Sequence, residues 1–367
     1  MRRVFSTEVR LSPAGYEVQE KRVLPRNSTC VVCIGTIGKI CLTSAPSFTN
    51  QQINSVIVDR EHCNPLYVYY LLTTAIPKVK KLEGGSASGR EHVRKSLFEQ
   101  IEVEVHPLPT QRKIAAILSA YDDLIENNTR RIAILEEMAQ AIYREWFVHF
   151  RFPGHEQVAM VDSELGPIPE GWTSGTLGGI GNLRKDRFIA DEHRDLPLLD
   201  LSRIPKRSLC ISEYGKSNEL RTSRIVFEEG DVLFGAIRPY LHKVAIAPFR
   251  GVTNTSVLVL RNRDTIPKSF LSCFLFSDGT VSWANQYSGG TKMPVIKWDV
   301  FSKMNVPIPP SHLLARFDNA MSPMFALIVS LVLRNFRLRR TRDLLLPRLI
   351  SGEVGVSELE INMGGLD

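Results

Sequence analysis

The amino-acid sequence of 367 residues contains two similar copies of one module, about 200 residues apart. A period of this length excludes a solenoid array, whose units have roughly 20–50 residues. It indicates a duplicated module, in which a globular domain is followed by a helix. Gly35 in the first copy corresponds to Gly235 in the second. The other matching segments are 49–50 with 253–254, 84–86 with 289–291, and 103–109 with 304–309.

The length suggests about two domains, and the composition is that of a soluble protein. No stretch approaches the roughly 20 uninterrupted apolar residues that a membrane span requires. The start, Met1–Val4, leads directly into charged sequence, which is not the pattern of a signal peptide. We therefore expect a cytoplasmic protein that does not bind a membrane.

The cysteines give little indication of a metal site. The sequence has 6 cysteines, and only Cys30 and Cys33 have a metal-like spacing, without a second such pair or a suitable pair of histidines. On an alternating strand, these two side chains would point to opposite faces. We expect reduced, packed cysteines and no metal ligands.

The net charge of +7, with an isoelectric point near 9.1, fits two kinds of surface. A protein of this size can carry a solvated basic surface without any partner. A surface that binds a polyanion such as nucleic acid is the other interpretation. The charge alone leaves both open.

Both copies are predicted to be rich in short β-strands, with a helix near Leu66–Lys81 in the first. Turn-forming residues separate the apolar runs, as expected for strands. The predicted strands are 29–34, 53–58 and 101–105 in the first copy, and 232–234, 244–247 and 256–260 in the second.

A long helix is predicted after each copy. The first has Thr110 as its N-cap and extends to Phe147, and the second begins at Ser311 and ends near Gly352. Apolar residues at spacings of three and four form one stripe on each helix. Because Pro323 lies inside the second pattern, we expect a kink or a local break there. The stripe residues assigned to helix packing or subunit docking are Ile114, Ile117, Tyr121, Leu135, Ile142, Trp146, Leu314, Phe317, Leu338 and Leu345.

These elements predict an α+β fold with an internal pseudo-twofold repeat. Two β-rich domains are separated by two long antiparallel helices, which form a coiled-coil spacer and hold the domains at a fixed separation. The predicted boundaries are 1–109 for the first domain, 110–150 for the first spacer helix, 151–170 for a linker, 171–309 for the second domain, 310–352 for the second spacer helix and 353–367 for the C-terminal tail.

The two helices differ in charge. Acidic residues predominate on the first helix, and arginines predominate on the second. Acidic and basic side chains could pair between the helices. The basic helix could also bind phosphates or a partner protein. Both interpretations remain open.

The sequence contains no recognisable catalytic motif. The run Gly35-Thr36-Ile37-Gly38-Lys39 is too short for a P-loop, and Ile40 stands where a serine or threonine is required. The Gly-x-Ser-x-Gly pattern of a nucleophile elbow does not occur. The histidines are scattered and form no zinc-protease pattern. We therefore predict a non-catalytic chain.

Four motifs in the predicted helices and linker occur together in one known family. They are PLPTQRKIAAILS at 107–119, AQAIYREWFV at 139–148, GPIPEGW at 166–172 and RTRDLLLPRLISGE at 340–353. In this order they resemble the specificity subunits of type I restriction–modification systems, the HsdS family. The resemblance covers nearly the whole chain.

The resemblance implies a DNA-binding, non-catalytic subunit with two target-recognition domains. Each domain would recognise one half of a split, asymmetric site in double-stranded DNA, and the helices would set the spacing. Two modification (methyltransferase) subunits are the implied partners, and a restriction complex adds translocase/endonuclease subunits. S-adenosylmethionine, ATP and magnesium are expected in those partners, and no cofactor is expected in this chain. The implied role is host defence in a bacterial or archaeal cytoplasm.

Hydrogen-bonding side chains in the turn-rich parts of each copy are the candidates for base contacts. A solvated surface side chain is the alternative for each of them, and the matching Asn50 and Asn254 are expected to share turn geometry. The candidates are Lys39, Gln51, Gln52, Arg90, Arg94 and Lys95 in the first copy, and Arg238, Tyr240, His242, Lys243 and Lys292 in the second.

The first copy lacks a counterpart of roughly 30 residues at the start of the second, because Met1 aligns near residues 201–204. Either the reading frame begins further upstream or this is a truncated, inactive specificity allele with an impaired first domain. A function of another class also fits the predicted architecture, namely a protein–protein scaffold with two adaptor domains on a coiled-coil bar. Salt-sensitive DNA binding would separate these alternatives.

Overall fold

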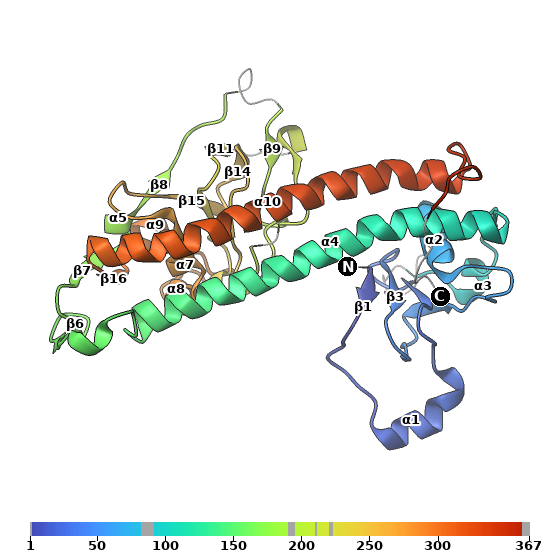
Figure 1. Ribbon diagram of the computed structural model, residues 1–367, viewed down its shortest axis with the longest axis horizontal. Helices are drawn as coiled ribbons and strands as arrows, with labels where there is room; N and C mark the ends of the chain where they lie inside the picture. The colour runs from blue at the N-terminus through green and yellow to red at the C-terminus, as the bar shows by residue number, and fades with distance from the viewer. Residues whose placement is uncertain (1, 82–91, 190–194, 210, 220–222, 362–367) are drawn as a thin grey trace. The chain divides into compact units, whose positions relative to one another are not determined.

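The computed structural model describes residues 2–81, 92–189, 195–209, 211–219 and 223–361, and Figure 1 labels its helices and strands. The matching segment 84–86, Arg90 and Cys210 lie outside these ranges. The chain divides into two compact units. The first unit comprises 1–126 and 337–367, and the second unit comprises 127–336. Each of the long helices, α4 (Leu108–Tyr143) and α10 (Ser311–Ile350), therefore contributes one part to each unit.

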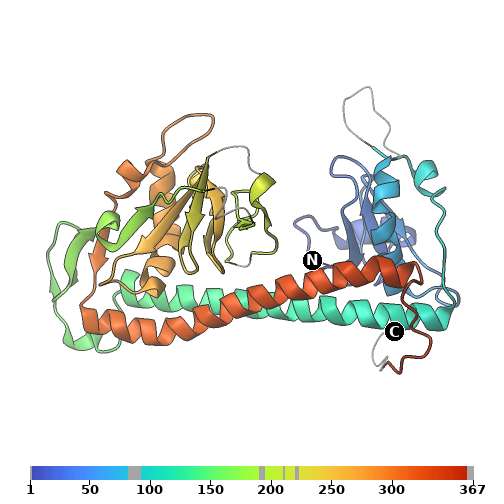
Figure 2. The ribbon, with the colours of Figure 1, turned by 90° about the horizontal axis from the view of Figure 1, so that it is seen from above.

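The first unit contains a four-stranded sheet in the order β1-β3-β2-β4, with α2 packed against one face (Figure 2). Leu42 of the sheet and Tyr67 of the helix are fully buried between them. The strands predicted at 29–34 and 53–58 are confirmed with shorter bounds, and the helix predicted near Leu66–Lys81 is confirmed with a start one residue earlier. The elements are β1 (Arg3–Val4), α1 (Pro13–Gln19), β2 (Thr29–Val32), β3 (Ile40–Thr43), β4 (Ile53–Val56), α2 (Pro65–Lys81) and α3 (Lys95–Phe98).

The second unit contains two four-stranded sheets, in the orders β13-β12-β15-β8 and β10-β9-β14-β11. The first of these sheets lies between α7 and the second sheet. Besides its parts of α4 and α10, the α-helices and strands of the second unit are β5 (Met160–Val161), β6 (Ile168–Pro169), β7 (Thr173–Thr176), α5 (Leu177–Ile180), β8 (Gly181–Arg184), β9 (Pro197–Leu198), β10 (Gly215–Lys216), β11 (Arg224–Phe227), β12 (Val232–Gly235), β13 (Val244–Ile246), β14 (Gly251–Asn254), β15 (Val257–Asn262), α7 (Lys268–Phe276), α8 (Asp278–Gln286), α9 (Trp298–Phe301) and β16 (Asn305–Ile308).

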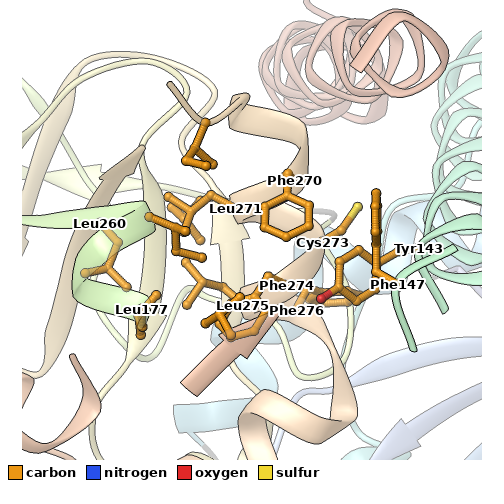
Figure 3. Packing of buried hydrophobic residues seen from close by; sticks show 14 of the residues in the cluster. Tyr143, Phe147, Leu177, Leu260, Phe270, Leu271, Cys273, Phe274, Leu275 and Phe276 are labelled. Carbon is orange, nitrogen blue, oxygen red and sulfur yellow. The ribbon is translucent and has the colours of Figure 1, made fainter. Parts of the chain in front are cut away.

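Successive side chains of β12 point to opposite faces of its sheet, and both faces are covered by hydrophobic clusters. Phe234 packs into the cluster that contains α7, and Leu233 packs on the other face with Phe227 of the second sheet. Figure 3 shows that Phe270 and Phe274 of α7 are directed toward the end of α4. This packing fixes the sheet, and the loops at its ends are left on the surface.

Backbone hydrogen bonds establish which residues of the two units are equivalent. The Cys33 N–H donates to the Gln52 carbonyl, and the Ala236 N–H donates to the Ser256 carbonyl in the same way. Cys33 is therefore equivalent to Ala236, and Gly35 is equivalent to Arg238. The predicted correspondence of Gly35 with Gly235 is wrong by three residues. Gly35 and Arg238 share a left-handed backbone, with φ of 80° and 51°, which a match of residue types does not reveal.

The strand predicted at 101–105 is wrong. These residues have no regular secondary structure, whereas their counterparts form β16, which pairs antiparallel with β7. A strand needs a neighbour because its backbone groups must find hydrogen-bond partners. Among the described residues of the first unit, no strand takes the place of β7 beside 101–105 or that of β8 beside β4.

The helices α4 and α10 are antiparallel within each unit. In the second unit Asn128 hydrogen-bonds to Asn335, and further along α4 the ring of Tyr143 lies 6.4 Å from that of Phe317, nearer the start of α10. In the first unit Asp122 pairs with Arg342, and Ile114 shares a core cluster with Leu349. This confirms the antiparallel arrangement. The Asp122–Arg342 pair also shows acidic–basic pairing between the helices, one of the two interpretations of their charges. The end of α4 continues as a π-helical turn, Arg144–Val148, which carries Trp146 and Phe147.

The helix starts and the proline differ from prediction. Thr110 and Ser311 are not N-caps, because α4 begins at Leu108 and α10 begins at Ser311 itself. Pro109 fits in the first turn, where a backbone N–H would have no intrahelical partner. The helix α10 is uninterrupted at Pro323, so the alternative of a local break is wrong, while the alternative of a kink stays a prediction. Pro323 is exposed, and the carbonyl that it leaves without a partner can therefore reach solvent.

All ten residues assigned to packing or docking are buried or half-buried. Other members of the predicted stripe, such as Leu124 and Met138, are 42% and 49% exposed. The predicted stripe has a period close to 3.5 residues, and the buried face of a straight helix with 3.6 residues per turn drifts away from it. By length and composition alone α10 could cross a membrane. Within the second unit, however, its Ile328, Leu331 and Val332 pack with Ile132 of α4.

A buried amide pair lies between the helices in the second unit. Asn128 donates to the Asn335 Oδ1 at 2.9 Å, and both side chains are almost fully buried. Replacing Asn335 alone with leucine is expected to lower the free energy of unfolding by about 1–3 kcal/mol, because the Asn128 amide loses its partner. Replacing both with leucine should recover most of this loss. Urea denaturation of the three proteins measures it, and a double variant less stable than the single one would contradict the pairing.

Candidate nucleic-acid interface

Three loops of the first unit meet at one end of its sheet. The Cys33 N–H donates to the Gln52 carbonyl, and the Val93 N–H donates to the Cys33 carbonyl, both at 2.8 Å. The loop after β2, the turn before β4 and the segment before α3 are thereby joined. The predicted side chains that this end exposes to solvent are Lys39, Gln51, Gln52, Arg94 and Lys95. Arg90 lies outside the described residues.

Lys80 is a further cation at this end that sequence reasoning missed. A side chain on Gly38 would lie 2.9 Å from the Lys80 Cε and 2.7 Å from Ile76, so the last turns of α2 pack against the loop. Gly38 also has φ of +90°, which favours glycine. The lysines near the end of α2 at 78–81 were the available signal.

The corresponding end of the second unit is built in the same way. The Arg238 N–H donates to the Pro294 carbonyl at 2.7 Å, which joins the loop after β12 to the segment 289–295. Arg238, Tyr240 and Lys292 are exposed there. Three of the five predicted residues in this copy are thus brought to one surface.

His242 and Lys243 require a correction, because their side chains are directed into the fold. His242 is 4% exposed, and its Nε2 hydrogen-bonds to the Phe276 carbonyl at 2.8 Å. Burial lowers its pKa, so the ring is held neutral. The Lys243 Nζ donates to the Leu201 carbonyl, and burial lowers its pKa as well. Both residues stabilise the loop and are not placed to contact a ligand.

A basic groove that sequence reasoning missed lies at the same end of this sheet. Its volume is about 780 Å³, and its lining includes Arg184, Lys185, Arg187 and Arg224. The Arg224 guanidinium lies 4.5 Å from the centre of the Phe188 ring, a stacking arrangement that holds an arginine without removing its charge. The clustered residues Arg184-Lys185-Asp186-Arg187 were the available signal.

Strand pairing shows that the groove and the Arg238 loop share one end of the sheet. β12 ends at Gly235, which pairs with Val257 at the start of β15. β8 ends at Arg184, which pairs with Val259 of the same strand. Arg184 is itself paired with Asp186 at 2.8 Å, whereas Lys185 and Arg187 are exposed and have no ion-pair partner among the described residues.

The charged groups do not form an evident metal site. Across the residues that the structure describes, no three histidine, cysteine, aspartate or glutamate side chains are grouped so that they could hold a metal ion. Both sheet ends offer cationic donors on exposed loops, with the Gln51 and Gln52 amides in the first unit and the Tyr240 hydroxyl in the second. Such donors suit phosphate oxygens and the edges of bases.

Comparisons with known proteins agree with this chemistry. The family model of the type I restriction modification DNA specificity domain matches residues 5–137 and 169–312. The type I restriction enzyme MjaIX specificity subunit of Methanocaldococcus jannaschii is 27% identical over 92% of this chain and 80% of the relative. The EcoDI specificity subunit of Escherichia coli is 23% identical over 80% and 74%, respectively. The crystal structure of a type I restriction–modification S subunit from M. genitalium shares the fold, with a TM-score of 0.53 and 16% identity over 89% of this chain and 83% of that one.

Proposed function

The chain belongs to the family of type I restriction–modification DNA specificity domains, and on this premise we propose that the loop end of each unit recognises one half of a split DNA site. The observation that carries the proposal is the matching position of the donors. In both units, exposed cationic and polar side chains gather at the equivalent end of an equivalent sheet. The chain itself acts as a non-catalytic specificity subunit.

The two units would recognise different bases. The first unit presents Gln51 and Gln52, whereas the equivalent turn of the second unit presents Thr255 and Ser256. Glutamine can hydrogen-bond adenine through two atoms, while the shorter hydroxyl groups discriminate less. A site with two different halves is therefore expected, which is an asymmetric sequence.

The basic groove of the second unit would hold the DNA backbone. Phosphate contacts position a protein on the duplex and supply much of its affinity. Lys185 and Arg187 are exposed at the groove, and Arg224 is held in place against Phe188. With the groove residues contacting phosphates, the loops that carry Arg238 and Lys292 would contact the bases.

Replacing both Lys185 and Arg187 with glutamine is expected to weaken DNA binding and reduce its salt dependence. Each lost phosphate contact lowers the slope of log K against log salt by about 0.9, so a decrease of about 1.8 is expected. Binding of the assembled complex to its DNA at several salt concentrations measures it. Arg263→Gln is the matched control, because Arg263 follows β15 at the opposite end of the sheet. Equal slopes for the double variant and the unaltered protein would rule out the groove as a phosphate site.

The long helices would bind the modification subunits. Ile134 and Met138 of α4 are about half exposed, at 50% and 49%, and Leu344 of α10 is 62% exposed. Helix–helix packing within each unit leaves these apolar side chains available to a partner. S-adenosylmethionine, ATP and magnesium would then belong to the modification and restriction subunits, and the assembly would work in the cytoplasm.

A further inference from the structure

Two cysteines of the first unit occupy directly opposite positions on neighbouring strands. Cys30 of β2 pairs with Cys41 of β3, and both are free thiols. The Val32 N–H donates to the Lys39 carbonyl two residues further along this ladder. Because hydrogen-bonded pairs alternate along an antiparallel ladder, Cys30 and Cys41 form such a pair, with Cα atoms about 5.5 Å apart. This Cα separation lies within the range that disulfide bonds span.

The two thiols also differ in their protonation. The Cys41 thiol hydrogen-bonds to the Cys30 sulfur and lowers the pKa of Cys30 to about 7, with a smaller contribution from Ser55. The same hydrogen bond raises the pKa of Cys41. The pair therefore favours a thiolate on Cys30 and a protonated thiol on Cys41.

The second unit shows that this chemistry is particular to the first. The positions equivalent to Cys30, Cys41 and Ser55 are Leu233, Ala245 and Val259, which pair with one another in the same way. These three are fully buried with residues of the second sheet. In the part of the first unit that the structure describes, only one sheet is present, and Cys41 remains half-buried. Two sulfurs and a hydroxyl thus replace three aliphatic side chains.

We propose that Cys30 and Cys41 are an oxidisable dithiol, which a peroxide converts into a reversible disulfide across β2 and β3. The Cys30 thiolate attacks one oxygen of hydrogen peroxide, the O–O bond breaks, and a sulfenic acid and water result after protonation. The Cys41 thiol then attacks the sulfenic sulfur, the S–S bond forms, and a second water leaves. Two thiols are oxidised and one peroxide is reduced to two waters.

The disulfide would act on the loop that carries Lys39. β2 and β3 are joined by residues 33–39, so a covalent link at 30 and 41 closes the base of this hairpin. Oxidation would restrict how the loop adjusts to a ligand and so lower the affinity of the first unit for DNA. This consequence rests on the proposed function, whereas formation of the disulfide does not.

Treating the full chain, in complex with its modification subunits, with hydrogen peroxide tests the proposal. Mass spectrometry of the alkylated, digested protein should identify a peptide pair linked through Cys30 and Cys41, which dithiothreitol separates. Formation should be about tenfold faster than oxidation of Cys63, because Cys41 lies opposite Cys30 and lowers the pKa of Cys30 to about 7, which favours the nucleophilic thiolate. Cys63 is the matched comparison, being a half-buried cysteine of the same unit outside the sheet.

Three variants make the outcome decisive. Cys41→Ser should stop the reaction at a sulfenic acid on Cys30 that dimedone labels, Cys30→Ser should give neither product, and Cys63→Ser should leave the link intact. A link that forms only in unfolding concentrations of urea, or no faster than Cys63 is oxidised, would overturn the proposal. If the disulfide forms but DNA affinity is the same in both redox states, the proposed effect of oxidation on the loop and on DNA affinity is contradicted. If neither redox state binds DNA, the proposed function fails and the dithiol stands.

Discussion

Replacing Phe317 with alanine is expected to lower the free energy of unfolding by about 3–5 kcal/mol, the usual cost of removing a buried aromatic ring. Phe317 is fully buried in the second unit, and its ring centre lies 4.7 Å from that of Phe147 and 5.7 Å from that of Trp146. The space left by the ring is enclosed by other rigid rings, so it cannot close easily. Urea denaturation followed by tryptophan fluorescence measures the loss.

Met138→Ala is the matched control for this prediction. Met138 lies on α4 in the same unit, but it is 49% exposed, so its truncation should change stability by less than about 0.5 kcal/mol. A Phe317→Ala protein as stable as the control would show that the aromatic cluster does not hold α4 and α10 together.

Removing the Asp122 carboxylate is expected to cost about 3 kcal/mol. Asp122 is buried in the first unit, where it accepts a hydrogen bond from the Tyr70 hydroxyl at 2.6 Å and pairs with Arg342. Burial raises the pKa of Tyr70, so its hydroxyl remains a donor. An Asp122→Ala variant leaves the buried Tyr70 hydroxyl and the Nη1 of Arg342 without their acceptor, while Arg342 keeps its exposed partner Asp343. Removing one partner of a buried pair is the costly way to break it.

Glu99→Ala separates this effect from a general loss of acidic charge. Glu99 pairs with Lys95 in the same unit, but both side chains are exposed, at 59% and 78%, so its loss should cost less than about 1 kcal/mol. Chemical denaturation of both variants tests the difference. Equal losses for Asp122→Ala and Glu99→Ala would mean that burial of the network contributes nothing.

The sequence predicted the helices and strands that are determined by neighbouring residues in the chain. The proline-rich runs at 107–109 and 307–310 mark the starts of α4 and α10 to within two residues, because proline restricts its own backbone wherever it stands. Apolar runs likewise located β12 and β15. The four motifs that resemble the specificity subunits lie on these helices and the linker, and the matching family model confirmed the inference drawn from them.

The sequence did not predict features that depend on contacts between residues far apart in the chain. The strand expected at 101–105 depends on a neighbouring strand, and apolar residues alone could not show that none is present among the described residues. His242 has φ of +50°, and its ring is buried against α7 instead of reaching the surface. The basic groove was missed because Arg224 meets Phe188 only after β11 has formed its sheet. Periodicity carries no information about such contacts.

The most direct test of the central claim is an adenine-methylation map of cells that express the modification subunit with and without this chain. If the chain is the specificity subunit, methylation should appear only in its presence, at a split motif with two different halves. A motif with one defined half would mean that the first unit does not recognise DNA. Identical methylation with and without the chain would contradict the assignment of sequence specificity to this protein.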